Sequence, residues 1–211
     1  MKRDKIVELF KTKSAEYLIL LGIGFGLSVT MSLNILYIIS AHMMTTYGEK
    51  LSEITEGGSF LGRAVFICLV GPVIEELLYR GVLFRVLKRF LPYLWVNLIQ
   101  AAIFAISHYN PIQAIYTFVL GLILGYVYNK CQTILAPILV HIGFNISGFL
   151  FPQLLTIYII AKIRNVWILC LIIIFILGFG LFLLWKCFDK IKNEGLPFGT
   201  KRTNHHAFLT K

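Results

Sequence analysis

The stretch Trp167–Trp185 reads WILCLIIIFILGFGLFLLW, an apolar run without a charged residue and with a tryptophan at each end. A helix of about 20 apolar residues crosses the hydrocarbon core of a bilayer, and tryptophan is enriched at both edges of that core. The whole chain of 211 residues agrees: 58% are hydrophobic, only 14% are charged, and the mean hydropathy is +0.80. Soluble domains carry about 25% charged residues, so the composition excludes an ordinary water-soluble globule and predicts a membrane protein.

Five further apolar stretches precede this one, and together they predict an all-α fold, a polytopic transmembrane helical bundle of about six spans. They are Tyr17–Ile39, about Gly62–Leu87, Leu91–His108, Pro111–Tyr128 and Thr133–Phe151. Asn110 and Pro111 predict where the fourth begins, because asparagine caps helices and proline suits the first helical position.

Three regions follow along the chain. Residues 1–61 hold a basic tail, the first helix and an external loop, residues 62–152 form the helical core with the polar groups, and residues 153–211 hold an interfacial segment, the last helix and a basic tail.

The basic residues concentrate at the two ends of the chain. The net charge is +10, with five basic and two acidic residues in 1–13 and six basic and two acidic in 186–211. Since cytoplasmic segments of membrane proteins are rich in Lys and Arg, we expect a multi-pass plasma-membrane protein with both termini cytoplasmic and no nucleic-acid partner. Lys162 and Arg164 would then lie outside, but two charges do not outweigh the eleven in the tails.

Two adjacent carboxylates interrupt the second apolar stretch, while the other eight acidic residues lie in tails or loops. Each of the two, Glu75 and Glu76, costs roughly 2.5–3.5 kcal/mol near the bilayer centre unless it finds a partner or water. Residues four apart share a helix face, so Glu76 should pair with Arg80, in a structural or a chemical role. Glu75 is turned about 100° away and lacks that cation, which suits a proton acceptor.

Two histidines and an asparagine are the other notable polar groups. His141 and Asn145 share a helix face and offer an imidazole and an amide, which fit an oxyanion or an interhelical hydrogen bond. His108, close to a helix end, is by itself more typical of an interfacial residue than of a catalyst. Gly121 and Gly125 form a GxxxG pair, which predicts close helix packing within the chain or between chains of a homo-oligomer.

Three motifs follow one another on successive apolar helices. Glu75–Arg80 (EELLYR) matches EExxxR, Phe104–His108 (FAISH) matches FxxxH, and His141–Asn145 (HIGFN) matches HxxxN. Over about Gly62–Phe151 the chain therefore resembles the CPBP family, the CAAX prenyl proteases and bacteriocin-processing proteins, also called Abi.

The resemblance implies an integral-membrane endopeptidase. It implies that Glu75 activates the attacking water with His108, that His141 and Asn145 stabilise the oxyanion, and that Glu76 and Arg80 organise the site. The family is often labelled metalloprotease, yet HExxH is absent, so the cofactor is either none or a divalent metal such as zinc held by Glu75, His108 and His141.

Three hypotheses for function follow. The first is hydrolysis of a membrane-associated peptide or protein substrate, lipidated or of the bacteriocin type, within the lipid bilayer. The second is a non-catalytic bacteriocin self-immunity or partner-binding membrane protein, whose polar groups serve packing alone. The third is a proton-coupled carrier that uses Glu75, which the short chain without matching broken halves disfavours.

Overall fold

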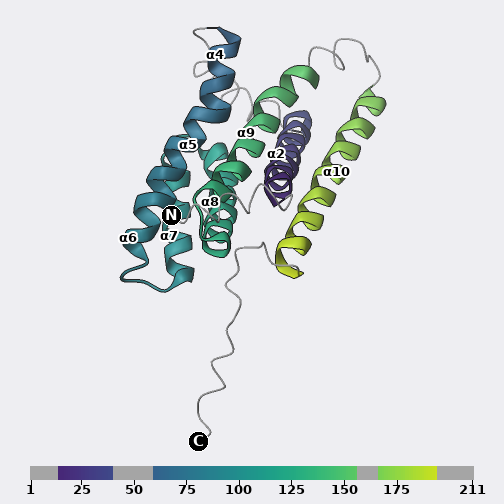
Figure 1. Ribbon diagram of the computed structural model, residues 1–211. Coiled ribbons are helices and arrows are strands. Elements are labelled where there is room, and N and C mark those ends of the chain that lie inside the picture. The colour runs from purple at the N-terminus through teal and green to yellow at the C-terminus, as the bar shows by residue number, and fades with distance from the viewer. Residues whose placement is uncertain (1–13, 40–58, 156–165, 194–211) are drawn as a thin grey trace, which may run out of the picture.

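The computed structural model describes residues 14–39, 59–155 and 166–193. The described part is a bundle of helices without a strand (Figure 1). Four of its helices are regular: α2 (Ser14–Ile39), α8 (Pro111–Cys131), α9 (Leu135–Leu155) and α10 (Val166–Asn193). A fifth, α7 (Tyr93–Ile106), is shorter. The all-α class is confirmed.

The remaining helical rod, residues 60–87, changes its winding four times. It consists of α4 (Phe60–Val65), a π-helical segment η1 (Phe66–Val70), α5 (Gly71–Glu76), a second π-helical segment η2 (Leu77–Leu83) and α6 (Phe84–Leu87). Ser59 caps its start by accepting a hydrogen bond from the Gly62 amide at 3.1 Å. The predicted break at Gly71 and Pro72 is therefore a local change of winding, and the rod continues through it.

Within the described ranges, three segments are long and apolar enough to cross a membrane: Ala15–Leu36, Pro111–Cys131 and Leu171–Lys190. These helices mark the chain as a membrane protein, but the predicted count of about six spans is not confirmed. The expected third span, Leu91–His108, is the clearest difference. Its helix has 14 residues and thus a length of about 21 Å, because it starts only after Pro92 and ends before Ser107.

The helix starts and ends predicted around residues 110–155 agree better with the structure. Asn110 caps α8 by accepting hydrogen bonds from the amides of Ile112 and Gln113, and Pro111 follows it as expected. The fifth stretch extends four residues past Phe151, so the segment that begins at Gln153 partly prolongs α9. The predicted outer cations Lys162 and Arg164, the external loop before residue 59 and both basic tails lie outside the described residues.

Helix α2 packs against α9 on one side and α10 on the other, while the rod 60–87 and α7 lie across α9 and α8 (Figure 1). Small residues bring α2 and α9 together: a side chain at Gly22 would collide with the Val140 carbonyl, and one at Gly143 with the Ile19 carbonyl. This approach fixes α9, the helix that carries His141 and Asn145.

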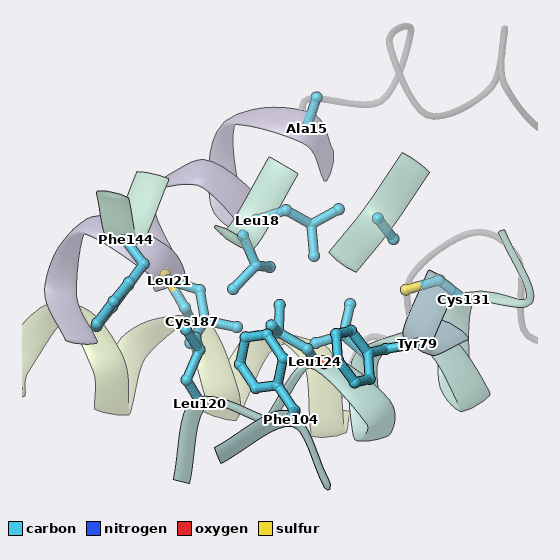
Figure 2. Close-up of a cluster of buried hydrophobic side chains, with 13 residues drawn as sticks. Ala15, Leu18, Leu21, Tyr79, Phe104, Leu120, Leu124, Cys131, Phe144 and Cys187 are labelled. Carbon is cyan, nitrogen blue, oxygen red and sulfur yellow. The ribbon is translucent and has the colours of Figure 1, made fainter. Parts of the chain in front are cut away.

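A buried apolar cluster joins the helices around the polar groups. Figure 2 shows Phe104 and Tyr79 next to Leu124, with Leu18 and Leu21 of α2 opposite them. The rings of Phe104 and Tyr79 meet edge to face with centroids 5.0 Å apart. Because Tyr79 belongs to the rod and Phe104 to α7, this contact sets the rod against α7 one residue away from Arg80.

Candidate active site

The two adjacent glutamates lie at the end of a short α-helical segment between two π-helical segments. At the first junction the Gly71 amide donates to Phe66 O, five residues back, and at the second the Phe84 amide donates to Tyr79 O, again five back. Such widened turns inside α-helices often accompany functional sites. They alter which way the side chains of α5 project compared with an uninterrupted helix.

The predicted ion pair between Glu76 and Arg80 forms in the core. Glu76 Oε1 lies 2.7 Å from Arg80 Nη1, and both side chains are fully buried. The same carboxylate oxygen lies 2.9 Å from His141 Nδ1 on α9. Since a carboxylate accepts, His141 donates through Nδ1 and Arg80 through Nη1, so Glu76 joins the rod to α9 as well as to its own helix turn.

Glu75 occupies a different environment from its neighbour. Its side chain is 37% exposed, and its Oε2 lies 3.7 Å from His141 Nε2. The prediction that Glu75 is turned away from the Glu76–Arg80 pair therefore agrees with the structure. The sequence predicts that His141 stabilises an oxyanion. In the structure, its Nε2 faces Glu75 and its Nδ1 faces Glu76.

His108 lies in the turn that follows α7, and its ring packs edge to face against that of Phe104. The centroid of Phe104 lies 4.9 Å from the ring of His108 and 5.7 Å from that of His141, and the Arg80 guanidinium carbon lies 5.1 Å from it. His108 Nδ1 lies 2.8 Å from Phe104 O, its own helix carbonyl. A carbonyl only accepts, so Nδ1 carries the proton and neutral His108 keeps its lone pair at Nε2.

The conditional metal set of Glu75, His108 and His141 does not converge. Across residues 14–39, 59–155 and 166–193, no three His, Cys, Asp or Glu side chains form a group that could hold a metal ion. This donor set therefore does not fit zinc, which takes at least three protein ligands at about 2.0–2.3 Å.

Asn145 projects from α9 one turn after His141, as the spacing predicts, but toward a different partner. Its Nδ2 donates to the main-chain carbonyl of Ile67 in η1 at 2.8 Å. One of its two N–H groups is thus committed to the rod.

Two amides that sequence reasoning missed extend the polar network into α7. Gln100 Nε2 donates to Gly121 O at 2.8 Å, and Arg80 Nη2 reaches the same carbonyl at 3.1 Å. Asn97 donates to Leu122 O at 3.1 Å and accepts from Gln100 at 2.9 Å. The signal was present in the sequence: an asparagine and a glutamine three apart, in an otherwise apolar helix, lie on one face and need buried partners.

The GxxxG pair makes room for this network within the chain. A side chain at Gly121 would press on the Ala101 backbone, and one at Gly125 would collide with Asn97 Oδ1. Of the two alternatives that the motif left open, the structure therefore has α8 packed closely on α7 of the same chain.

Three polar atoms of the network are buried without a hydrogen-bond partner: Glu76 Oε2, Arg80 Nε and Gln100 Oε1. Arg80 and Gln100 share the Gly121 carbonyl, so their unpartnered atoms belong to one region of the core.

Comparison with known proteins gives one match. The chain matches no curated protein and no solved structure. Residues 57–147 match the family model described as "Type II CAAX prenyl endopeptidase Rce1-like". This range contains the rod, α7, α8 and the part of α9 that carries His141 and Asn145, and hence all three motifs. Residues 57–147, somewhat less than half of the chain, are thus similar to the Rce1-like family, the CPBP type of CAAX prenyl endopeptidase.

Proposed function

We propose that this chain hydrolyses peptide bonds of membrane-associated peptides, lipidated or of the bacteriocin type, with Glu75 as the group that activates water. At the level of the family, the match supports a CAAX-type intramembrane protease. The helical core of residues 62–152 would hold the site, and the multi-pass protein would lie in the plasma membrane with both termini cytoplasmic.

The contrast between Glu75 and Glu76 carries the proposal. Glu76 is fully buried and bound to both Arg80 and His141, so it has no free access to a substrate. Glu75 is 37% exposed, and its Oε2 lies 3.7 Å from His141 Nε2. A polar contact longer than about 3.5 Å leaves room for a bridging water, so Glu75 Oε2 is the oxygen best suited to take a proton from one.

The reaction is written with the chain's own residues. Glu75 removes a proton from water, the water oxygen bonds to the scissile carbonyl carbon, and the carbon–nitrogen bond breaks as Glu75 returns the proton to the leaving amine. His108, through the lone pair on Nε2, assists in holding the water. Glu76 and Arg80 act as positioning residues for His141.

Two residues of α9, His141 and Asn145, would stabilise the oxyanion. The Nε2 position of His141 can carry a hydrogen as well as Nδ1. That N–H is a donor for the developing negative charge, and the second Nδ2–H of Asn145 is another.

One observation favours the alternative of a non-catalytic immunity or partner-binding protein. Most of the polar groups have ordinary structural partners: His108 bonds its own helix carbonyl, Asn145 bonds Ile67 O, and Arg80 bonds Glu76 and Gly121 O. A purely structural network would look like this too, so the alternative is tested directly.

The experiment reconstitutes the full chain in vesicles with a farnesylated CAAX peptide or a bacteriocin precursor peptide and follows products by mass. The proposal predicts cleavage by the wild type and loss of cleavage in Glu75→Ala, His108→Ala and His141→Ala. In parallel, cells that express the same variants are exposed to bacteriocin. Protection that survives in all three variants, together with no cleavage by the wild type, would favour the binding protein.

A further inference from the structure

One hydrogen bond connects α9 to the interior of the helical rod. Asn145 Nδ2 donates to Ile67 O at 2.8 Å, across 78 residues of sequence. Inside a helix a carbonyl normally accepts from the amide four residues later, or five residues later in a π-helical turn. Ile67 O accepts from another helix, so the two donors that its own helix would normally supply need to be identified.

Both local donors to Ile67 O are missing. Four residues later, the Gly71 amide donates to Phe66 O instead. Five residues later stands Pro72, which has no N–H to donate. A carbonyl left unpaired away from bulk water is costly.

We propose that Asn145 is a positioning residue: it supplies the hydrogen bond that Pro72 cannot, and so fixes the turn of the rod that leads into Glu75 and Glu76. The proline and the asparagine form a matched pair on two helices. Pro72 removes a hydrogen-bond donor from the rod, and Asn145 on α9 replaces it.

The hydrogen bond between Asn145 and Ile67 O lies close enough to the site to affect the orientation of Glu75. His141, one turn before Asn145 on α9, lies 2.9 Å from Glu76 through Nδ1. Helix α9 thus forms hydrogen bonds with the rod at two points. One is Ile67 O, which precedes α5, and the other is Glu76, the last residue of α5. With both points held, α5 cannot rotate about its axis, and Glu75 stays directed at His141 Nε2. This step rests on the proposed function, since it assumes that the direction of Glu75 governs the reaction.

A double-mutant cycle tests the inference, because Pro72→Ala restores an N–H five residues after Ile67. Asn145→Ala alone should lower the thermal midpoint, since it leaves Ile67 O without a donor, and should reduce kcat by more than about tenfold, since it also removes the oxyanion N–H. In the Pro72→Ala background the same asparagine change should alter the midpoint only slightly, and it should lower kcat by a smaller factor, which is the part due to the lost oxyanion N–H. Pro72→Val is the second rescue variant, in case the smaller side chain leaves a destabilising cavity.

Asn34→Ala is the matched control. Asn34 in α2 also donates from Nδ2 to a carbonyl at 2.8 Å, that of Thr30, where the sequence has no proline to remove the helical donor. Its removal should have a small effect on the midpoint, identical in the wild-type and Pro72→Ala backgrounds, and no effect on cleavage.

The outcomes separate this inference from the proposed function. If Asn145→Ala abolishes cleavage equally in both backgrounds without a change in midpoint, Asn145 acts only on the oxyanion and the inference is wrong while the protease stands. If the wild type cleaves nothing, the protease proposal fails, yet the cycle of thermal midpoints still decides the inference. Additive midpoints across the cycle overturn it.

Discussion

Glu76 and His141 are 65 residues apart in the sequence and share a 2.9 Å contact between Oε1 and Nδ1 in the buried core. The same oxygen bonds Arg80 at 2.7 Å. Arg80 and His141, from two of the motifs, therefore both bond Glu76 Oε1. This junction fixes the position of α9 relative to the rod.

Glu76→Gln should destabilise the protein strongly. The change leaves the Arg80 charge buried without its carboxylate, and breaking a buried pair typically costs about 3–5 kcal/mol. Thermal unfolding in detergent measures this, with Glu16→Gln as the control because Glu16 is exposed in the first turn of α2. An equal, small effect of the two changes would mean that the ion pair does not support the fold.

Gly125→Ala and Gly148→Ala should shift stability in opposite directions. A methyl group at Gly125 meets Asn97 Oδ1 and Gln100 Nε2, whereas nothing lies within 4 Å of one at Gly148. Overpacking costs about 1–3 kcal/mol, while alanine in place of an unconstrained helical glycine gains up to about 1 kcal/mol. The two midpoints, measured side by side, check the close packing of α8 on α7, and a tolerated Gly125→Ala would contradict it.

His108→Ala and His141→Ala should both abolish cleavage but differ in stability. His141 is bound to a fully buried carboxylate, so its loss leaves Glu76 with one partner fewer, at a cost of about 1–3 kcal/mol. His108 bonds only its own helix carbonyl and is half-buried, so the midpoint should fall less. Cleavage and unfolding are measured on the same preparations. Full activity of His108→Ala would remove it from the mechanism.

Gln100→Leu tests the network that the sequence reasoning missed. The leucine removes the unpartnered Oε1, but it also removes the donor to Gly121 O and to Asn97 Oδ1, so stability should fall by about 1–3 kcal/mol. Arg80 keeps Gly121 O, and activity should fall only a few-fold. A loss of activity as large as that of His141→Ala would instead give Gln100 a direct part in the site.

Local patterns in the sequence predict local structure well. Asn110 and Pro111 predict the start of α8 to the residue, because capping depends on the residue types at two adjacent positions. The four-residue spacing of Glu76 and Arg80 predicts their ion pair, because both residues lie in one helix. The apolar composition likewise predicts the helical class.

Relations between helices were harder to predict. Asn145 of α9 points toward Ile67 O because Pro72, five residues after Ile67 in the rod, has no N–H to donate. The periodicity of apolar residues contains no information about such a missing donor. The partners of His141 depend on how closely α9 approaches the rod, which small residues such as Gly22 and Gly143 set through α2. The same holds for Gly121 and Gly125, where the motif alone left packing within or between chains open.

The most direct measurement of the central claim is peptide cleavage by Glu75→Gln in reconstituted vesicles, compared with wild type and Glu16→Gln at equal folded fraction. The substitution keeps the shape of the side chain and removes its ability to take a proton. We predict that product formation falls at least about 100-fold in Glu75→Gln and stays at the wild-type level in Glu16→Gln. Wild-type cleavage by folded Glu75→Gln would contradict the claim that this carboxylate activates water.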